Sequence, residues 1–101
     1  MASIVIVSKH LFLNENGRDL ELPTGYGDCV VFSNMKKAED YVVDVISKYN
    51  LYTTEPEFDR YEYGKNFCST QGAEAIITYS QVDYNTNGIR TTFKLIERIV
   101  E

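Results

Sequence analysis

Apolar residues alternate with polar ones along much of the chain, a pattern typical of β-strands. The first predicted strand covers residues 3–13. It contains the β-branched run Ile4–Val7, which is apolar on both of its alternating faces. We therefore expect an inner strand of a sheet. Asn16 and Gly17 follow, and both residue types tolerate positive φ angles. Because residues 18–22 alternate again, the pattern predicts a hairpin that returns along the first strand.

One segment has helical spacing instead. Its apolar residues recur at intervals of three and four, with charged residues between them. This stripe consists of Met35, Ala38, Val42, Val45, Ile46 and Tyr49. We predict an amphipathic helix over about residues 35–49, preceded by a short strand at residues 29–32. Ser33 or Asn34 would cap its start, and Asn50 would close its end.

The rest of the chain predicts three more strands. Residues 57–63 are aromatic but heavily acidic, which favours an edge strand. Residues 64–72 form a connection, from which Phe67 and Cys68 are expected to reach the core. A long C-terminal hairpin follows over about residues 74–99.

The turn of this C-terminal hairpin allows two pairings. A two-residue loop at Asn87 and Gly88 would place Gln81 opposite Lys94. A four-residue loop over residues 85–88 would instead place Asp83 opposite Arg90. Because opposite charges that face each other contribute about 0.2–1 kcal/mol, we favour the four-residue loop.

These elements define an α+β fold, in which a single helix packs on a mainly antiparallel sheet of five or six strands. The length of 101 residues suits one domain, covering residues 1–101. One helix can hide only one face of such a sheet. The other face must be exposed to solvent, covered by the long hairpin folding over it, or covered by a second copy of the chain.

Composition narrows the class of protein. The hydrophobic fraction of 44% supports a folded core, and the longest apolar runs are far too short for a membrane span. The start of the chain lacks the pattern of a signal peptide. The net charge of −5 argues against a general affinity for nucleic acid or anionic lipid. Two cysteines, Cys29 and Cys68, are too few for a disulfide scaffold, so we expect reduced thiols in the cytoplasm.

The negative charge is concentrated between residues 55 and 62, where four acids and one arginine give a net charge of −3. Acids interleaved with aromatic residues suit contact with a partner protein, in particular a basic one, although a solvated edge strand would look the same. The candidate binding residues are Glu55, Glu57, Phe58, Asp59, Tyr61, Glu62 and Tyr63.

Two other classes of function remain open. His10, the only histidine, could act as a base for Cys29 or Cys68 in a thiol-dependent enzyme, or it could be an ordinary strand residue that shares a face with Ser8 and Phe12. Alternatively, a nucleic acid could contact the face of the last strand that carries Arg90, Lys94 and Arg98. We expect no metal site and no cofactor, because the three soft metal ligands form no close pair.

The leading hypothesis is a non-enzymatic protein-protein interaction module. We expect it to bind a partner protein, or a second copy as a homodimer, through the acidic, tyrosine-rich edge or the uncovered face of the sheet. The small size and the lack of catalytic motifs would suit a regulator or inhibitor encoded by a phage or mobile element.

Overall fold

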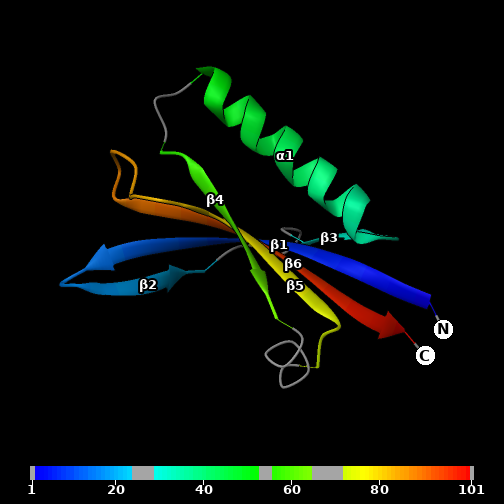
Figure 1. Ribbon diagram of the computed structural model, residues 1–101. Helices are drawn as coiled ribbons and strands as arrows, with labels where there is room; N and C mark the ends of the chain where they lie inside the picture. The colour runs from blue at the N-terminus through cyan, green and yellow to red at the C-terminus, as the bar shows by residue number, and fades with distance from the viewer. Residues whose placement is uncertain (1, 24–28, 53–55, 65–71, 101) are drawn as a thin grey trace.

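The computed structural model confirms the α+β fold, with one helix on one side of a six-stranded sheet (Figure 1). It describes residues 2–23, 29–52, 56–64 and 72–100. The elements are β1 (Ala2–Glu15), β2 (Arg18–Leu22), β3 (Cys29–Phe32), α1 (Met35–Tyr52), β4 (Phe58–Tyr63), β5 (Ala75–Gln81) and β6 (Ile89–Val100). The expected positions of Phe67 and Cys68 lie outside the described residues.

All strand pairs are antiparallel, and the spatial order is β2-β1-β6-β5-β4. The long strand β1 is an inner strand, as predicted. Its first half pairs with β3 and its second half with β2, while β6 pairs along the whole of its other edge. Ala2 lies opposite Val100, so the first and last strands pair with each other inside the sheet. The acidic strand β4 is an edge strand, also as predicted.

The first hairpin has the turn that its sequence predicts. Glu15 lies opposite Arg18, so the loop consists of Asn16 and Gly17 alone. Both have positive φ angles, 54° and 79°. A residue with a larger or branched side chain would be strained at either position, and the turn therefore fixes the register of β1 against β2.

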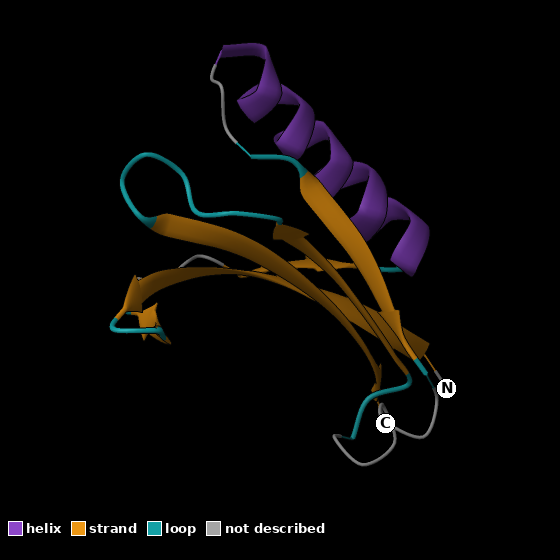
Figure 2. Cartoon of the chain, turned by 60° about the vertical axis from the view of Figure 1, so that its left-hand side comes forward, coloured by secondary structure: helices purple, strands orange, loops and turns teal. Residues whose placement is uncertain are grey.

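The core lies between α1 and one face of the sheet, which we call the helix face (Figure 2). Ala38 and Val42 of α1 are fully buried against strand residues on that face. Met35, Val45 and Ile46 of the predicted stripe pack against the same cluster. The buried strand residues are Val5, Val7, Ile77, Tyr79, Phe93 and Leu95.

The ends of α1 confirm one predicted cap and correct the other. The Asn34 side chain accepts a hydrogen bond from the backbone N–H of Lys37 at 2.9 Å, so Asn34 is the N-cap. Asn50 does not close the helix, because α1 continues to Tyr52. Leu51 and Tyr52 are compatible with a helix, and Pro56, the first strong helix breaker after Asn50, comes only four residues beyond Tyr52.

Neither predicted register of the C-terminal hairpin is correct. Tyr79 lies opposite Phe93, and Thr78 lies opposite Lys94. The pairing of β5 with β6 ends at Ser80, which lies opposite Thr92, and the backbone N–H of Val82 donates to the backbone oxygen of Glu57, just before β4, at 2.8 Å. Residues 82–88 then form a wide loop, in which the Asn85 side chain accepts hydrogen bonds from the backbone.

Candidate functional site on the open face of the sheet

The face of the sheet that is turned away from α1, here called the open face, is covered by no described helix. Directly opposite residues of an antiparallel pair lie on the same face, so the strand registers define rows of side chains across it. One row runs from Ser8 of β1 through Lys94 of β6 and Thr78 of β5 to Tyr61 of β4. The next row contains His10, Thr92, Ser80 and Asp59.

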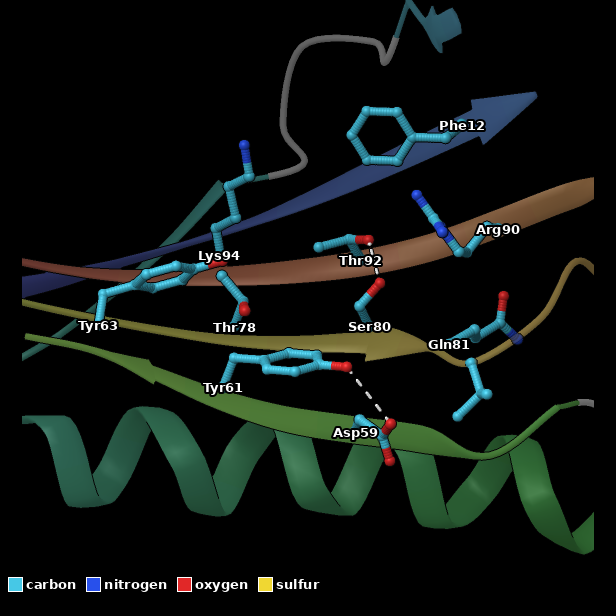
Figure 3. Close-up of a pocket in the computed structure, with 11 residues that line it drawn as sticks. Phe12, Asp59, Tyr61, Tyr63, Thr78, Ser80, Gln81, Arg90, Thr92 and Lys94 are labelled. Atoms are coloured by element: carbon cyan, nitrogen blue, oxygen red, sulfur yellow. Dashed lines mark hydrogen bonds between the residues drawn. The ribbon is translucent and has the colours of Figure 1, made fainter. Parts of the chain in front are cut away.

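The open face is hollowed where these rows cross β4, β5 and β6 (Figure 3). The hollow has a volume of about 350 Å³ and is lined by Phe12, Asp59, Tyr61, Tyr63, Thr78, Ser80, Gln81, Val82, Arg90, Thr92 and Lys94. The hydroxyl groups of Ser80 and Thr92 are hydrogen-bonded to each other at 2.9 Å. Aromatic side chains from β1 and β4 flank this polar centre (Figure 3). The hollow therefore offers both hydrogen-bonding groups and contact area.

The charged groups of the hollow differ in how well they are paired. Lys94 is half-buried and makes no ion pair with any described residue. Asp59 is exposed and accepts a long hydrogen bond, 3.4 Å, from the hydroxyl of Tyr61. A negative group that entered the hollow would meet Lys94, and a positive one would meet Asp59.

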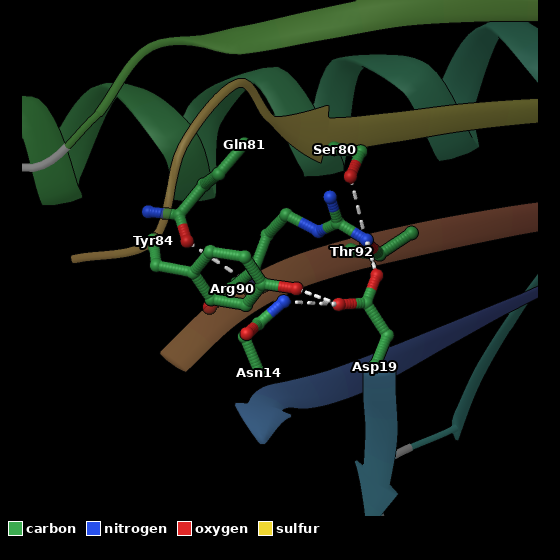
Figure 4. Close-up of polar contacts among 8 residues, drawn as sticks. Asn14, Asp19, Ser80, Gln81, Tyr84, Arg90 and Thr92 are labelled. Atoms are coloured by element: carbon green, nitrogen blue, oxygen red, sulfur yellow. Dashed lines mark hydrogen bonds and ion pairs between the residues drawn. The ribbon is translucent and has the colours of Figure 1, made fainter. Parts of the chain in front are cut away.

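Arg90, by contrast, is held in a cluster of polar contacts that joins three parts of the chain (Figure 4). Its Nη2 donates to Asp19 Oδ2 at 2.6 Å, and its guanidinium carbon lies 5.9 Å from the ring centre of Phe12 and 5.2 Å from that of Tyr84. Asp19 also accepts hydrogen bonds from Tyr84 and Asn14. The Nε of Arg90 is buried without a hydrogen-bond partner among the described residues. We call Arg90, Asp19, Tyr84 and Asn14 the Arg90 cluster.

A second polar cluster lies beside the hollow, on β1 and β2. The Oγ of Ser8 is 2.8 Å from Nε2 of His10, and Nδ1 of His10 contacts Oε1 of Glu21. The hydrogen bond with His10 is the main cause that lowers the pKa of Glu21 from its ordinary value of 4.5, and Lys94 lowers it further by its charge. We call these three residues the Ser8 cluster.

The predicted acidic binding segment does not form a single surface. Along β4 the side chains alternate, so Asp59, Tyr61 and Tyr63 lie on the open face while Phe58 and Glu62 lie on the helix face. Tyr61 is 50% exposed and Tyr63 is 40% exposed. Glu57 is exposed just before β4, and Glu55 lies outside the described residues.

The helix-face members of β4 have structural partners. The ring of Phe58 packs against that of Phe93, with centres 6.0 Å apart, and joins the core. Arg60 donates to Glu39 of α1 at 2.7 Å, and Tyr79 donates to the same oxygen at 3.0 Å. The contact with Glu39 raises the pKa of Arg60, and burial raises the pKa of Tyr79. This side of β4 therefore attaches the edge strand to the helix.

The basic residues of β6 lie on the open face, as predicted, but they are not equivalent. Arg90 is paired with Asp19 of β2, and not with the acidic strand. Arg98 donates to the backbone oxygen of Gly72 at 2.9 Å. Only Lys94 of the three faces the hollow without an ion pair to a described residue. Near Arg98 the open face becomes apolar, since Ala73 and Ile76 are buried against Ile96.

The structure does not pair His10 with Cys29, as the hypothesis of a thiol-dependent enzyme would require. Cys29 is an exposed free thiol that lies opposite Ser8. The hydrogen-bonding partner of His10 is the hydroxyl of Ser8. Cys68, the other candidate, lies outside the described residues.

Sequence reasoning missed Ser8, Asp19, Glu21 and Tyr84 as members of these clusters. A signal for two of them was present. The two-residue turn at Asn16 and Gly17 sets Glu21 opposite Phe12, which is two residues from His10 on the same face. The same register sets Asp19 opposite Asn14. Tyr84 has no such signal, because it comes from the wide loop that joins β5 to β6.

Comparisons with protein-family models, with curated proteins and with solved structures found no match for this chain. Within the described ranges, no group of three or more potential metal ligands is gathered in one place. In the same part of the chain, no helix has both the length and the apolar character that a membrane span requires.

Proposed function

We propose that this chain is a small protein-interaction module, whose hollow on the open face binds a segment of a partner protein. A regulator or inhibitor encoded by a phage or mobile element remains the biological setting that suits its size. The observation that carries the proposal is the combination, in one hollow, of two well-exposed tyrosines with a lysine that has no ion pair to a described residue.

Tyrosine at such a position favours binding of a polypeptide. Its ring provides a large contact area with few rotatable bonds, and its hydroxyl provides a hydrogen bond. Tyr61 and Tyr63 lie on an edge strand, on the side away from the core, and are 50% and 40% exposed. The exposed surface of each ring can therefore contact a partner.

The charges of the hollow indicate the chemistry of the partner segment. An acidic side chain would pair with Lys94, a half-buried residue that makes no ion pair with a described residue. A basic or hydrogen-bonding group would face Asp59 at the margin. We therefore propose a segment that carries an acidic residue next to an aromatic or apolar one. This proposal differs from the basic partner that the acidic segment suggested, because β4 divides its acids between two faces.

A cytoplasmic location belongs to the same proposal. It is supported by the low cysteine count and by Cys29, which is an exposed free thiol. Reduced thiols are stable in the cytosol and are uncommon in secreted small domains.

The proposal can be tested with a displayed library of random 12-residue peptides selected on the immobilised protein. We expect the recovered peptides to share an acidic residue next to an aromatic or apolar one. Their binding should fall at least about tenfold in Lys94→Glu and in Tyr61→Ala, because both changes remove contacts at the centre of the interface. Lys37→Glu is the matched control, since Lys37 is exposed on α1 and its replacement changes the net charge equally.

Two results would contradict the proposal. One is recovery of no binding peptide, or of peptides that bind the Lys94 and Lys37 variants equally well. The other is self-association through the open face, seen by analytical ultracentrifugation as a dimer that Tyr61→Ala dissociates. In that case the occupant of the hollow is a second copy of the chain.

A further inference from the structure

The Ser8 cluster places a hydroxyl group, an imidazole and a carboxylate in sequence on the open face. Ser8 Oγ lies 2.8 Å from His10 Nε2, and Glu21 contacts the other ring nitrogen. We propose that Ser8 is a nucleophile that is activated by His10 and positioned by Glu21, and that it reacts with carboxylic esters. This activity does not depend on partner binding, although the two would share Lys94 and the hollow.

The hydrogen bonds determine which atom carries the ring proton. An ionised carboxylate can only accept hydrogen bonds, so a neutral His10 must carry its proton on Nδ1, where it donates to Glu21. Nε2 is then an acceptor, and the hydroxyl of Ser8 donates to it. This is the tautomer that a general base needs in order to remove the hydroxyl proton, with a third group orienting the base. The lowered pKa of Glu21 keeps its carboxylate ionised.

The surroundings of Ser8 supply two further requirements of acyl transfer. Lys94 lies directly opposite Ser8 on β6, and it makes no ion pair with a described residue. Its ammonium group can attract the negative charge that develops on the carbonyl oxygen during attack. Lys94 also lines the hollow, so the aromatic or apolar part of an ester held at Ser8 could extend across Lys94 toward the hollow.

The reaction balances without a cofactor. Ser8 Oγ forms a bond to the acyl carbon while its proton passes to Nε2 of His10. The bond between the acyl carbon and the leaving alcohol then breaks, and the alcohol takes the proton from Nε2. A water molecule attacks the acyl-serine by the same route, which releases the carboxylic acid and restores the Ser8 hydroxyl.

The test uses the whole chain with a fluorophosphonate probe, followed by digestion and mass spectrometry of the labelled peptides. Attack by Ser8 would form an oxygen–phosphorus bond and release fluoride. We expect Ser8 to be labelled at least about 100-fold faster than Ser47, the matched control, because base catalysis typically contributes a factor of this size. Ser47 is exposed on α1, where its hydroxyl donates to the backbone of Val43.

Variants of His10 and Glu21 distinguish activation of the Ser8 hydroxyl by His10 from simple exposure of that hydroxyl to the probe. His10→Gln should reduce labelling of Ser8 to the rate of Ser47. Glu21→Ala should reduce the labelling of Ser8 in part. Glu21→Gln should reduce it less, because the Gln carbonyl oxygen can still accept a hydrogen bond from Nδ1–H of His10. The same order is expected for release of p-nitrophenol from p-nitrophenyl acetate. Thermal unfolding shows which variants are folded.

The result in the unchanged chain is decisive even if a variant does not fold. Equal labelling of Ser8 and Ser47 would overturn the proposal, as would labelling of Ser8 that persists in folded His10→Gln. If the unchanged chain bound no peptide while Ser8 was still labelled, the hollow would not be the partner site and the proposal for Ser8 would stand.

Discussion

The two faces of the sheet use the same strands in opposite ways. On the helix face, Val7, Leu95 and Phe93 are buried, with at most 4% of their surface exposed. On the open face, the neighbouring residues of the same strands are Ser8, Lys94 and Thr92. The helix face thus carries the apolar contacts that hold the fold together. The open face carries ionisable groups and hydroxyls that a core would not tolerate unless they were paired.

This difference shows why function is to be sought on the open face. Polar groups there are organised into the Arg90 cluster, the Ser8 cluster and the hollow between the strands. On the helix face the ionisable groups have a structural role, as in the contact of Arg60 and Tyr79 with Glu39. If the comparison is correct, substitutions on the two faces should separate stability from binding.

The largest effect on stability is expected for Leu95→Ala on the helix face. Leu95 is completely buried, and its truncation leaves a cavity that should cost about 2–5 kcal/mol in the free energy of unfolding. Tyr61→Ala on the open face should cost less than about 1 kcal/mol. Urea denaturation measures both. Similar losses for the two variants would show that the faces do not differ as described.

A smaller effect is expected for Asp19→Asn in the Arg90 cluster. This change removes the charge that pairs with Arg90 at 2.6 Å and should cost about 1 kcal/mol in the free energy of unfolding. The matched control is Asp44→Asn, which removes a pair with Lys48 on the surface of α1 and should cost less than about 0.5 kcal/mol. If the two losses were equal, the Arg90 cluster would be no more than a surface ion pair.

The smallest expected effect is the contribution of Glu21 to the pH dependence of the free energy of unfolding. The pKa of Glu21 is lower in the folded chain than in the unfolded one, so its ionised form stabilises the fold. That contribution is fully present above the ordinary value of 4.5 and is lost as the pH falls through the lower folded value. Since Glu21 is 53% exposed, solvent limits the contribution to about 0.5 kcal/mol or less.

Stability curves of the wild type and Glu21→Gln as a function of pH measure this contribution. The difference between the two proteins should be constant near neutral pH and shrink below pH 4.5. A difference that instead grew as the solution became more acidic would show that the contact with His10 does not stabilise the carboxylate.

Much of the fold could be predicted because its signals are local. The stripe of α1, the turn at Asn16 and Gly17 and the edge position of β4 follow from residue spacing and turn chemistry. The hairpin between β5 and β6 could not be predicted in the same way. The end of its pairing coincides with a hydrogen bond from Val82 to Glu57, a residue just before β4 and far away along the chain.

The candidate site was predicted only in part. Tyr61, Tyr63 and Asp59 do lie together on an exposed face, and Lys94 faces them as a member of the predicted basic set. Phe58, one of the candidate binding residues, lies apart from them, because alternation along β4 directs it toward Phe93 in the core. The partner of Arg90 proved to be Asp19 rather than Asp83, since the register of the hairpin differs from the one expected.

The sequence by itself determined which residues form the helix and strands, because periodicity and turn propensity act over a few neighbours. It also indicated a single helix, and among the described residues one face of the sheet has no helix on it. The tertiary structure alone decided how β1 aligns with β6, and therefore that Lys94 lies opposite Ser8, beside His10 and Glu21. The physical reason is that such contacts join residues far apart in the chain, and a change of one residue in register would move each side chain to the opposite face.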